Sequence, residues 1–443
     1  MINLDIPLNE NTIRQIIENN YIDRNKYLNG LLNLLNTINE SKIIALDGEW
    51  GSGKTWFVKS LEYLLNDDTN VKTNEINIDT LKNVKSKYMT FYYNAWENDD
   101  ASSAMLSLIY KLVNDSCLQM ENDKTGMFPR ILNTLIKYAT NGNIDVKNDL
   151  FGEQWTNKQI TDEIKTSEEI KDTFRELINN LLIENKNKIL IIIDEIDRCK
   201  PTFAIELLEN IKHFYDDERI VFLVSTNNKQ LSASVCKVYG EKYDGDAYLD
   251  KFFDLNLELP NNYIEKYILA IDENKSSSQY SEKSCREIAK YYNFTMREYN
   301  RYLKSIEMIK EYISITGLIY YISVPINHIF IPLAMALKIK RKSEYYTFIN
   351  GNLFSIIENL VDNNEYFYRI GKNILKNKNP ASIGEIYNMQ ISEEEKKERE
   401  RKEIINTLKE IYYNVFDNCK DEEYKWEYKE NLENLLDIIS MMK

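Results

Sequence analysis

Short apolar runs alternate with amphipathic stretches over the first 260 residues. The runs indicate strands at 42–46, 88–93, 189–193, 219–226 and 252–260. Between them, apolar residues recur at helical spacing at about 54–65, 101–119, 168–185, 203–215 and 228–239. Strands that alternate with helices predict an α/β fold, in which helices flank a parallel sheet.

The two ends of the chain have a different pattern. Residues 10–39 predict two amphipathic helices, and beyond residue 260 the pattern is almost wholly helical, including the mixed-charge run 393–402, which we expect to be a solvated helix face. A polar stretch at about 120–168 lacks a sustained period and indicates an insertion. We therefore expect N-terminal helices (1–40), an α/β core (41–260) with a helical or polar insertion around 101–187, and an all-α C-terminal domain (261–443).

Composition narrows the class of protein. In 443 residues, 43% hydrophobic and 12% aromatic content excludes a disordered chain, and a net charge of −14 counts against a nucleic-acid-binding surface, although it leaves room for a local basic groove. Two histidines are too few for a multi-histidine metal site. Five cysteines without a CxxC pair, and no apolar leader at the start, predict a cytoplasmic protein with reduced thiols.

Residues 312–337 carry no Asp, Glu, Lys or Arg, and such a stretch is long enough to span a bilayer. Asn327, His328 and two prolines lie near its middle, where unpaired polar groups are costly in lipid. We expect a buried helical hairpin that bends near Asn327 and His328. A membrane segment is the alternative.

The strongest chemical pattern follows the first strand. It is a complete GxxxxGK[ST] loop, Gly48-Glu49-Trp50-Gly51-Ser52-Gly53-Lys54-Thr55. Its glycines let backbone N–H groups wrap phosphate oxygens, and the next helix adds the positive end of its dipole. Lys54 is expected to reach the terminal phosphates and Thr55 to bind Mg²⁺. The pattern predicts a nucleotide site formed by the loop and the adjoining Trp56; an ordinary Gly-rich turn is the alternative.

Two acidic residues follow the apolar run Ile189–Ile193. Asp194 is expected to reach the Mg²⁺ shell beside Thr55, and Glu195 to polarise the attacking water. A carboxylate directly after the metal-binding Asp favours an ATPase over a GTPase. The GTPase pattern N-K-x-D is also missing, since Asn228-Lys229 continues with Gln230-Leu231. These patterns predict Mg²⁺-dependent ATP hydrolysis with Lys54 and Glu195 in catalytic roles, against the alternative of a plain acidic turn.

Further polar residues lie close to the predicted strand ends. Arg198, with its neighbour Asp197, is expected to orient Glu195 or contact phosphate, with a capping ion pair as the alternative. Asn227 or the preceding Thr226 is expected beside the γ-phosphate as a polar sensor, with a turn residue as the alternative.

Four other residues have weaker predicted roles. Asn94 is a candidate switch that hydrogen-bonds the catalytic glutamate, with a capping residue as the alternative. Trp96 is expected to be a core anchor, with a ligand contact as the alternative. Arg297 is the candidate arginine for the γ-phosphate; Arg301, one turn away, is its alternative, and a surface ion pair is the competing interpretation.

The order of these motifs resembles the KAP family of P-loop NTPases. The resemblance rests on GEWGSGKT, FYYNAWEND, IIIDEIDRC, IELLENIKHFYDDERIVFLVST, YLDKFFDLNLELP and MREYNRYLKSI, over about residues 20–340. Many members carry transmembrane helices between the two nucleotide motifs. Residues 56–188 hold no uncharged run near 18 residues, so this chain resembles a soluble version. Glu195 also replaces the commoner Asp.

The resemblance implies an ATP- and Mg²⁺-dependent switch whose C-terminal helices pass the nucleotide state to a partner. Bacterial members are often linked to phage exclusion or defence with a separate effector protein. Neighbouring subunits often supply arginines to such sites, so we expect a homo-oligomer, an effector partner or both. A nucleic-acid-sensing or remodelling ATPase is the main alternative, and the acidic charge counts against it. A membrane-associated scaffold and a small-molecule kinase are further alternatives.

Overall fold

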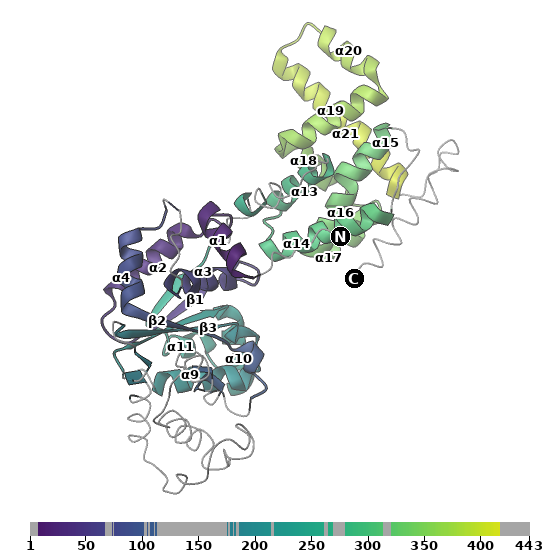
Figure 1. Ribbon diagram of the computed structural model, residues 1–443. Coiled ribbons are helices and arrows are strands. Elements are labelled where there is room, and N and C mark those ends of the chain that lie inside the picture. Colours follow the sequence, from purple (N-terminus) through teal and green to yellow (C-terminus); the bar gives the residue numbers. More distant parts are fainter. Residues whose placement is uncertain are drawn as a thin grey trace. The chain divides into compact units, whose positions relative to one another are not determined.

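The computed structural model describes residues 8–416 with internal gaps. The gaps are 67–72, 74, 102–103, 105–106, 110, 113–174, 176–177, 180, 183–185, 214–216, 261–264, 269–279 and 313–319. The chain divides into two compact units, one over residues 7–263 and the other mainly over residues 264–443 (Figure 1). Most of the insertion expected at 101–187, with its two helices, lies outside the described residues.

Five parallel strands form the sheet of the N-terminal unit, in the order β2-β3-β4-β1-β5 (Figure 1). The strands are β1 (Lys42–Asp47), β2 (Tyr88–Asn94), β3 (Lys188–Asp194), β4 (Ile220–Thr226) and β5 (Leu255–Glu258). Every predicted strand is therefore present, and the predicted α/β class is confirmed. Strand β4 pairs with both β1 and β3. It therefore lies between β1, which precedes the GxxxxGK[ST] loop, and β3, which ends in the acidic residues.

The central strands are buried on both faces, as a parallel sheet covered by helices requires. Ile189, Ile191 and Ile193 contribute to one hydrophobic core, whereas Leu190 and Ile192 contribute to the other, because successive side chains of a strand point to opposite faces. One face is covered by α9 (Pro201–His213), α10 (Asn228–Tyr239) and α11 (Gly245–Leu249), and the other by α1 (Glu10–Asn19), α2 (Asn25–Thr37), α3 (Lys54–Asn66) and α4 (Ile78–Lys87) (Figure 1).

The N-terminal helices share a core with the sheet. Ile13 of α1 and Leu28 and Leu32 of α2 are buried in the same cluster as Ile44 of β1 and Phe57 of α3. Helix α4 was not predicted, because only Leu81 and Val84 of its ten residues are buried.

The regular secondary structure described in the C-terminal unit is all helical. Its helices are α13 (Tyr280–Tyr291), α14 (Met296–Tyr312), α15 (Tyr320–Pro325), the π-helical turn η4 (Ile326–Phe330), α16 (Ile331–Lys340), α17 (Lys342–Ile349), α18 (Ser355–Asn363), α19 (Glu365–Lys378), α20 (Pro380–Asn388) and α21 (Glu393–Phe416). The predicted all-α architecture of this region is confirmed over the described residues.

The prediction of a helical hairpin that bends near Asn327 and His328 is wrong. Both residues lie in η4, within one helix that runs from Tyr320 to Lys340. Proline removes a backbone donor and usually kinks a helix, but the wider π-helical turn that follows Pro325 changes the hydrogen-bond register without ending the helix. Among the described residues this is the single helix long and apolar enough to cross a membrane, and 61% of its most apolar window is buried, as in a core helix.

The charge run at the start of α21 is not wholly a solvated face, since Glu400 is buried (2% exposed). Its carboxylate accepts hydrogen bonds from Tyr368 Oη (2.6 Å), Tyr387 Oη (2.8 Å) and Lys372 Nζ (3.0 Å). Burial alone would raise the pKa of Glu400, but these donors outweigh it and hold the pKa below its usual value. The carboxylate therefore links α19, α20 and α21 as an anion.

We expect Glu400→Gln to lower the free energy of unfolding at pH 7 by roughly 2 kcal/mol, because it removes the charge that three donors satisfy. A carboxyl with a lowered folded-state pKa stabilises above its unfolded pKa, and this contribution is lost as pH falls through the folded value. The difference between wild type and variant, measured by urea unfolding, should therefore shrink below about pH 4. Glu398→Gln, at an exposed ion pair on the same helix, is the control and should leave the free energy of unfolding close to that of the wild type. A pH-independent difference would contradict this account.

Candidate nucleotide site

The GxxxxGK[ST] loop joins β1 to α3 in the conformation that its glycines permit. Gly51 and Gly53 have φ of +85° and +89°, a region that residues with a side chain rarely adopt. At Gly48 a Cβ atom would lie 2.9 Å from Ser52 Oγ, so a larger residue would require the Ser52 side chain to move. The Gly48 N–H donates to Thr226 O of β4 (3.1 Å), which ties the loop to the sheet.

Lys54 turns back into the loop. Its ammonium group donates to the carbonyl oxygens of Gly48 and of Glu49 (3.3 Å for the latter). Burial lowers the pKa of Lys54, while the carboxylates of Asp197 and Asp194 act in the opposite direction. The predicted phosphate-binding cation and the two acids after β3 therefore belong to one electrostatic site.

Asp194 ends β3 and is almost completely buried (1% exposed). One carboxylate oxygen accepts the Glu195 N–H (3.0 Å), and the other accepts the hydroxyl of Tyr92 on β2 (3.1 Å). Burial and the Asp194 charge raise the pKa of Tyr92, so the phenol stays a hydrogen-bond donor. Asp194 is thus held by fixed donors at the carboxyl end of the sheet.

Glu195 follows in the left-handed region, with φ of +62°. Residues other than glycine occupy this region sparsely, and such positions cluster at functional sites. The Glu195 carboxylate forms an ion pair with Arg198 (2.7 Å), and the Arg198 guanidinium lies over the ring of Trp96 (5.3 Å to the centroid). The predicted base is therefore oriented by an arginine from the same turn.

Asp197 lies in the short 3₁₀ turn η3 (Ile196–Arg198) and is 8% exposed. Its carboxylate accepts a hydrogen bond from the indole Nε1–H of Trp50, in the GxxxxGK[ST] loop. This contact joins residues 147 positions apart in the sequence. The loop and the turn after β3 are thereby connected side chain to side chain.

Two buried hydroxyls at the site have no hydrogen-bond partner among the described residues. They are Ser52 Oγ in the loop and Thr226 Oγ1 at the end of β4. An unsatisfied buried hydroxyl costs free energy unless a ligand or water supplies a partner, so both fit a site that binds phosphate oxygens or metal-bound water. No group of three or more His, Cys, Asp or Glu side chains that could hold a metal occurs in the described part of the chain. A single carboxylate and a hydroxyl suit Mg²⁺, which keeps several water and phosphate ligands.

Asn227 and Asn94 both accept hydrogen bonds from nearby backbone groups. The Asn227 side chain caps α10 by accepting the Gln230 N–H (3.3 Å) with its amide oxygen, and its role beside the γ-phosphate stays a prediction. Asn94 Oδ1 likewise accepts the backbone N–H of Trp96 (3.1 Å). Trp96 is 50% exposed, so the expected core anchor is wrong: its ring supports Arg198 at the surface. Arg297 lies on α14 in the C-terminal unit, and its role stays a prediction.

The sequence did not point to Arg24 or Tyr92. Arg24, before α2, is 1% exposed and donates to Ser52 O of the loop (2.9 Å). Arg24 belongs to no motif quoted above, and Tyr92 lies in FYYNAWEND without a role that this pattern predicts; both act through contacts distant in sequence. For Tyr92, the alternation along β2 was the available signal, since it places this side chain and the buried Tyr88 on the same face.

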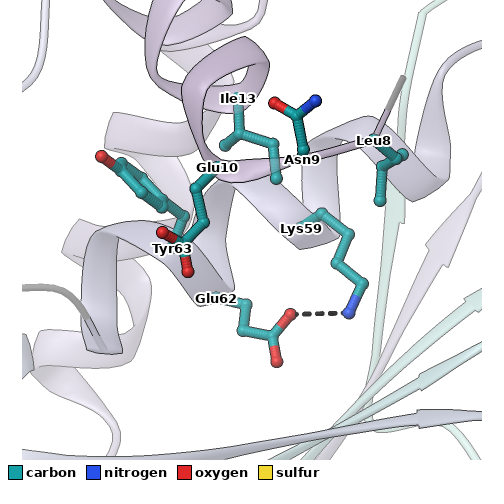
Figure 2. A pocket seen from close by; sticks show the side chains of 7 residues that line it. All are labelled: Leu8, Asn9, Glu10, Ile13, Lys59, Glu62 and Tyr63. Atoms are coloured by element: carbon teal, nitrogen blue, oxygen red, sulfur yellow. Dashed lines mark hydrogen bonds and ion pairs between the residues drawn. The ribbon is translucent and has the colours of Figure 1, made fainter.

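A hollow of about 600 Å³ lies beside the site, between the start of α1 and α3 (Figure 2). Lys59 and Glu62 form an ion pair at its floor (2.8 Å; Figure 2). The Lys59 ammonium also lies 3.1 Å from the ring centroid of Tyr92, which donates to Asp194. A cation–π contact and a hydrogen bond therefore link Lys59, which lines this hollow, to Asp194, the predicted metal-binding carboxylate.

Together, the glycine-rich loop between β1 and α3 and the acidic end of β3 in an all-parallel sheet define a P-loop nucleoside triphosphatase. The model of the KAP family P-loop domain matches residues 24–323, more than half of the chain. The chain therefore belongs to the KAP family, as its motifs predicted. No curated protein matches it.

We expect Lys54→Ala to abolish nucleotide binding measured by calorimetry, because Lys54 supplies the positive charge within the loop that faces the phosphates. Circular dichroism should show an intact fold. Unchanged nucleotide affinity in a folded variant would contradict the assignment of this loop as the phosphate-binding site.

Thr226→Val should slow nucleotide hydrolysis about 10-fold or more, as loss of a hydrogen bond to developing charge does, without lowering stability. Replacing a buried hydroxyl that has no partner among the described residues by a methyl group of similar size is close to neutral for folding. Ser225→Ala removes another such hydroxyl from the opposite face of β4 and is the control. A large loss of stability in Thr226→Val, or hydrolysis as fast as in Ser225→Ala, would count against a role for Thr226 at the phosphate.

Proposed function

We propose that this protein is a Mg²⁺-dependent ATPase that acts as a molecular switch. The observation that carries the proposal is the position of β4 between β1 and β3. Parallel strands end at the same edge of a sheet, so the loop after β1, Thr226 at the end of β4, and Asp194 and Glu195 at the end of β3 converge. Phosphate cradle, polar sensor and acidic pair are the parts that nucleotide hydrolysis requires.

Several features support ATP as the nucleotide. A guanine-reading N-K-x-D sequence is missing at residues 228–231, which instead form the first turn of α10. The backbone N–H of Asn228 donates to Asp47 Oδ1 (2.8 Å), so this turn is fixed to the end of β1. The adjacent acids Asp194 and Glu195 also suit an ATPase.

In the proposed reaction, Lys54 and the loop hold the β- and γ-phosphates. Thr55 and Asp194 would hold Mg²⁺, which when bound would supply charge neutralisation at the phosphate oxygens. Glu195 accepts a proton from the water that attacks the γ-phosphorus, and the bond to ADP breaks. Arg198 orients the Glu195 carboxylate through the ion pair at 2.7 Å. The products are ADP and inorganic phosphate.

The switch role adds the C-terminal unit. We propose that its helices pass the nucleotide state to a partner in the cytoplasm, either a second copy or a separate effector, and that Arg297 contributes a guanidinium to the phosphate. Resemblance to bacterial family members supports a place in anti-phage defence. Native mass of the purified protein with ATP and Mg²⁺ tests this part: an assembly or bound effector is expected, and a monomer under every nucleotide condition would contradict it.

Glu195→Gln and Asp194→Asn separate chemistry from binding. Glu195→Gln keeps the size of the side chain but cannot accept a proton, so hydrolysis should fall ~10²–10⁴-fold while nucleotide binding stays near wild type. Asp194→Asn should instead weaken Mg²⁺-dependent binding.

Phosphate release and calorimetry on the same preparations measure both properties. Hydrolysis at the wild-type rate by Glu195→Gln would show that the base lies elsewhere, and Asp197 would be the next candidate.

A further inference from the structure

Trp50 is the aromatic residue inside the phosphate-binding loop. Its side chain is 46% exposed, so burial of apolar surface does not fix its position. Within the described part of the chain, its side chain makes a hydrogen bond from Nε1 to the Asp197 carboxylate. A Trp at this place is therefore positioned by a partner in the turn after β3 rather than by the core.

The turn that carries Asp197 is short and internally bonded. The Arg198 N–H donates to Glu195 O (3.1 Å), and the Cys199 N–H donates to Ile196 O (3.3 Å). Ile196 is completely buried and anchors the turn below the surface. In so short a turn, a shift of Asp197 moves Arg198 as well.

Arg198 is the residue that holds the predicted base. Its guanidinium is fixed on one side by the Glu195 carboxylate (2.7 Å) and on its face by the ring of Trp96 (5.3 Å). A planar guanidinium held in this way sets the direction of its carboxylate partner. A continuous set of contacts thus runs from the phosphate-binding loop to the base.

We propose that Trp50 is a positioning residue for the Glu195 base, acting through Asp197 and Arg198, so that the alignment of the base depends on the conformation of the phosphate-binding loop. The inference rests on the proposed ATPase function. It assigns to the Trp50 side chain a role in the rate of hydrolysis, distinct from the backbone of the loop, which contacts phosphate.

The test is a double-mutant cycle on the full-length protein with Trp50→Phe and Asp197→Leu. Phe keeps the aromatic surface and removes the N–H donor, and Leu removes the acceptor. A misplacement near 1 Å costs up to about 100-fold in rate, so we expect Trp50→Phe to lower kcat for ATP by about 10- to 100-fold with Kd changed less than about twofold. In the Asp197→Leu background, Trp50→Phe should have no further effect, because the contact is already broken.

Tyr239→Phe is the matched control. It removes a hydroxyl that donates to the Glu209 carboxylate (3.2 Å) from an exposed aromatic ring on α10, away from the loop and the turn. Its kcat should equal that of the wild type, and thermal unfolding should show that all variants are folded.

Three results would overturn the inference while leaving the ATPase intact: a kcat for Trp50→Phe within twofold of wild type, a loss confined to nucleotide affinity, or effects that add in the double variant. The second result would make Trp50 a nucleotide contact. A folded wild-type protein that binds but never hydrolyses ATP would overturn the proposed function and this inference with it.

Discussion

The hydrogen-bond register of β4 with its two neighbours fixes where the candidate catalytic side chains lie. On one side Thr226 pairs with Asp47, the last residue before the loop, and on the other Val224 pairs with Ile193, the last residue before Asp194. A slip of one residue would turn each of these side chains to the opposite face of the sheet. The Gly48 N–H bond to Thr226 O extends this register into the loop itself.

Around this register, the loop is supported from three directions. Arg24 bonds Ser52 O from the N-terminal helices, Trp50 reaches Asp197 beyond β3, and Lys54 closes the interior of the loop. Tyr92 supports Asp194 from the edge of the sheet. Because these supports come from distant parts of the chain, the geometry of the site depends on the fold of the whole N-terminal unit.

The strands, the glycine-rich loop and the two acids could be predicted because each has a local signature: period-two or continuous apolar runs, glycines at fixed spacing, and carboxylates directly after a buried strand. Arg24 and Tyr92 could not, since their partners lie 28 and 102 positions away and no local pattern encodes the pairing. Trp96 was misplaced because an aromatic residue after a strand suggests a core, whereas its ring supports Arg198 at the surface. The predicted hairpin is wrong because Pro325 suggests a bend, whereas the π-helical turn after it lets the helix continue.

We propose that the converging ends of β1, β4 and β3 form one site for Mg²⁺-dependent ATP hydrolysis. The decisive measurement is steady-state phosphate release from ATP by the full-length protein, first with Mg²⁺ and then with EDTA in its place. We expect turnover with Mg²⁺ that stops in EDTA, and return of turnover when Mg²⁺ is restored. Equal hydrolysis in EDTA, or none with Mg²⁺ from a folded protein that binds ATP, would contradict it.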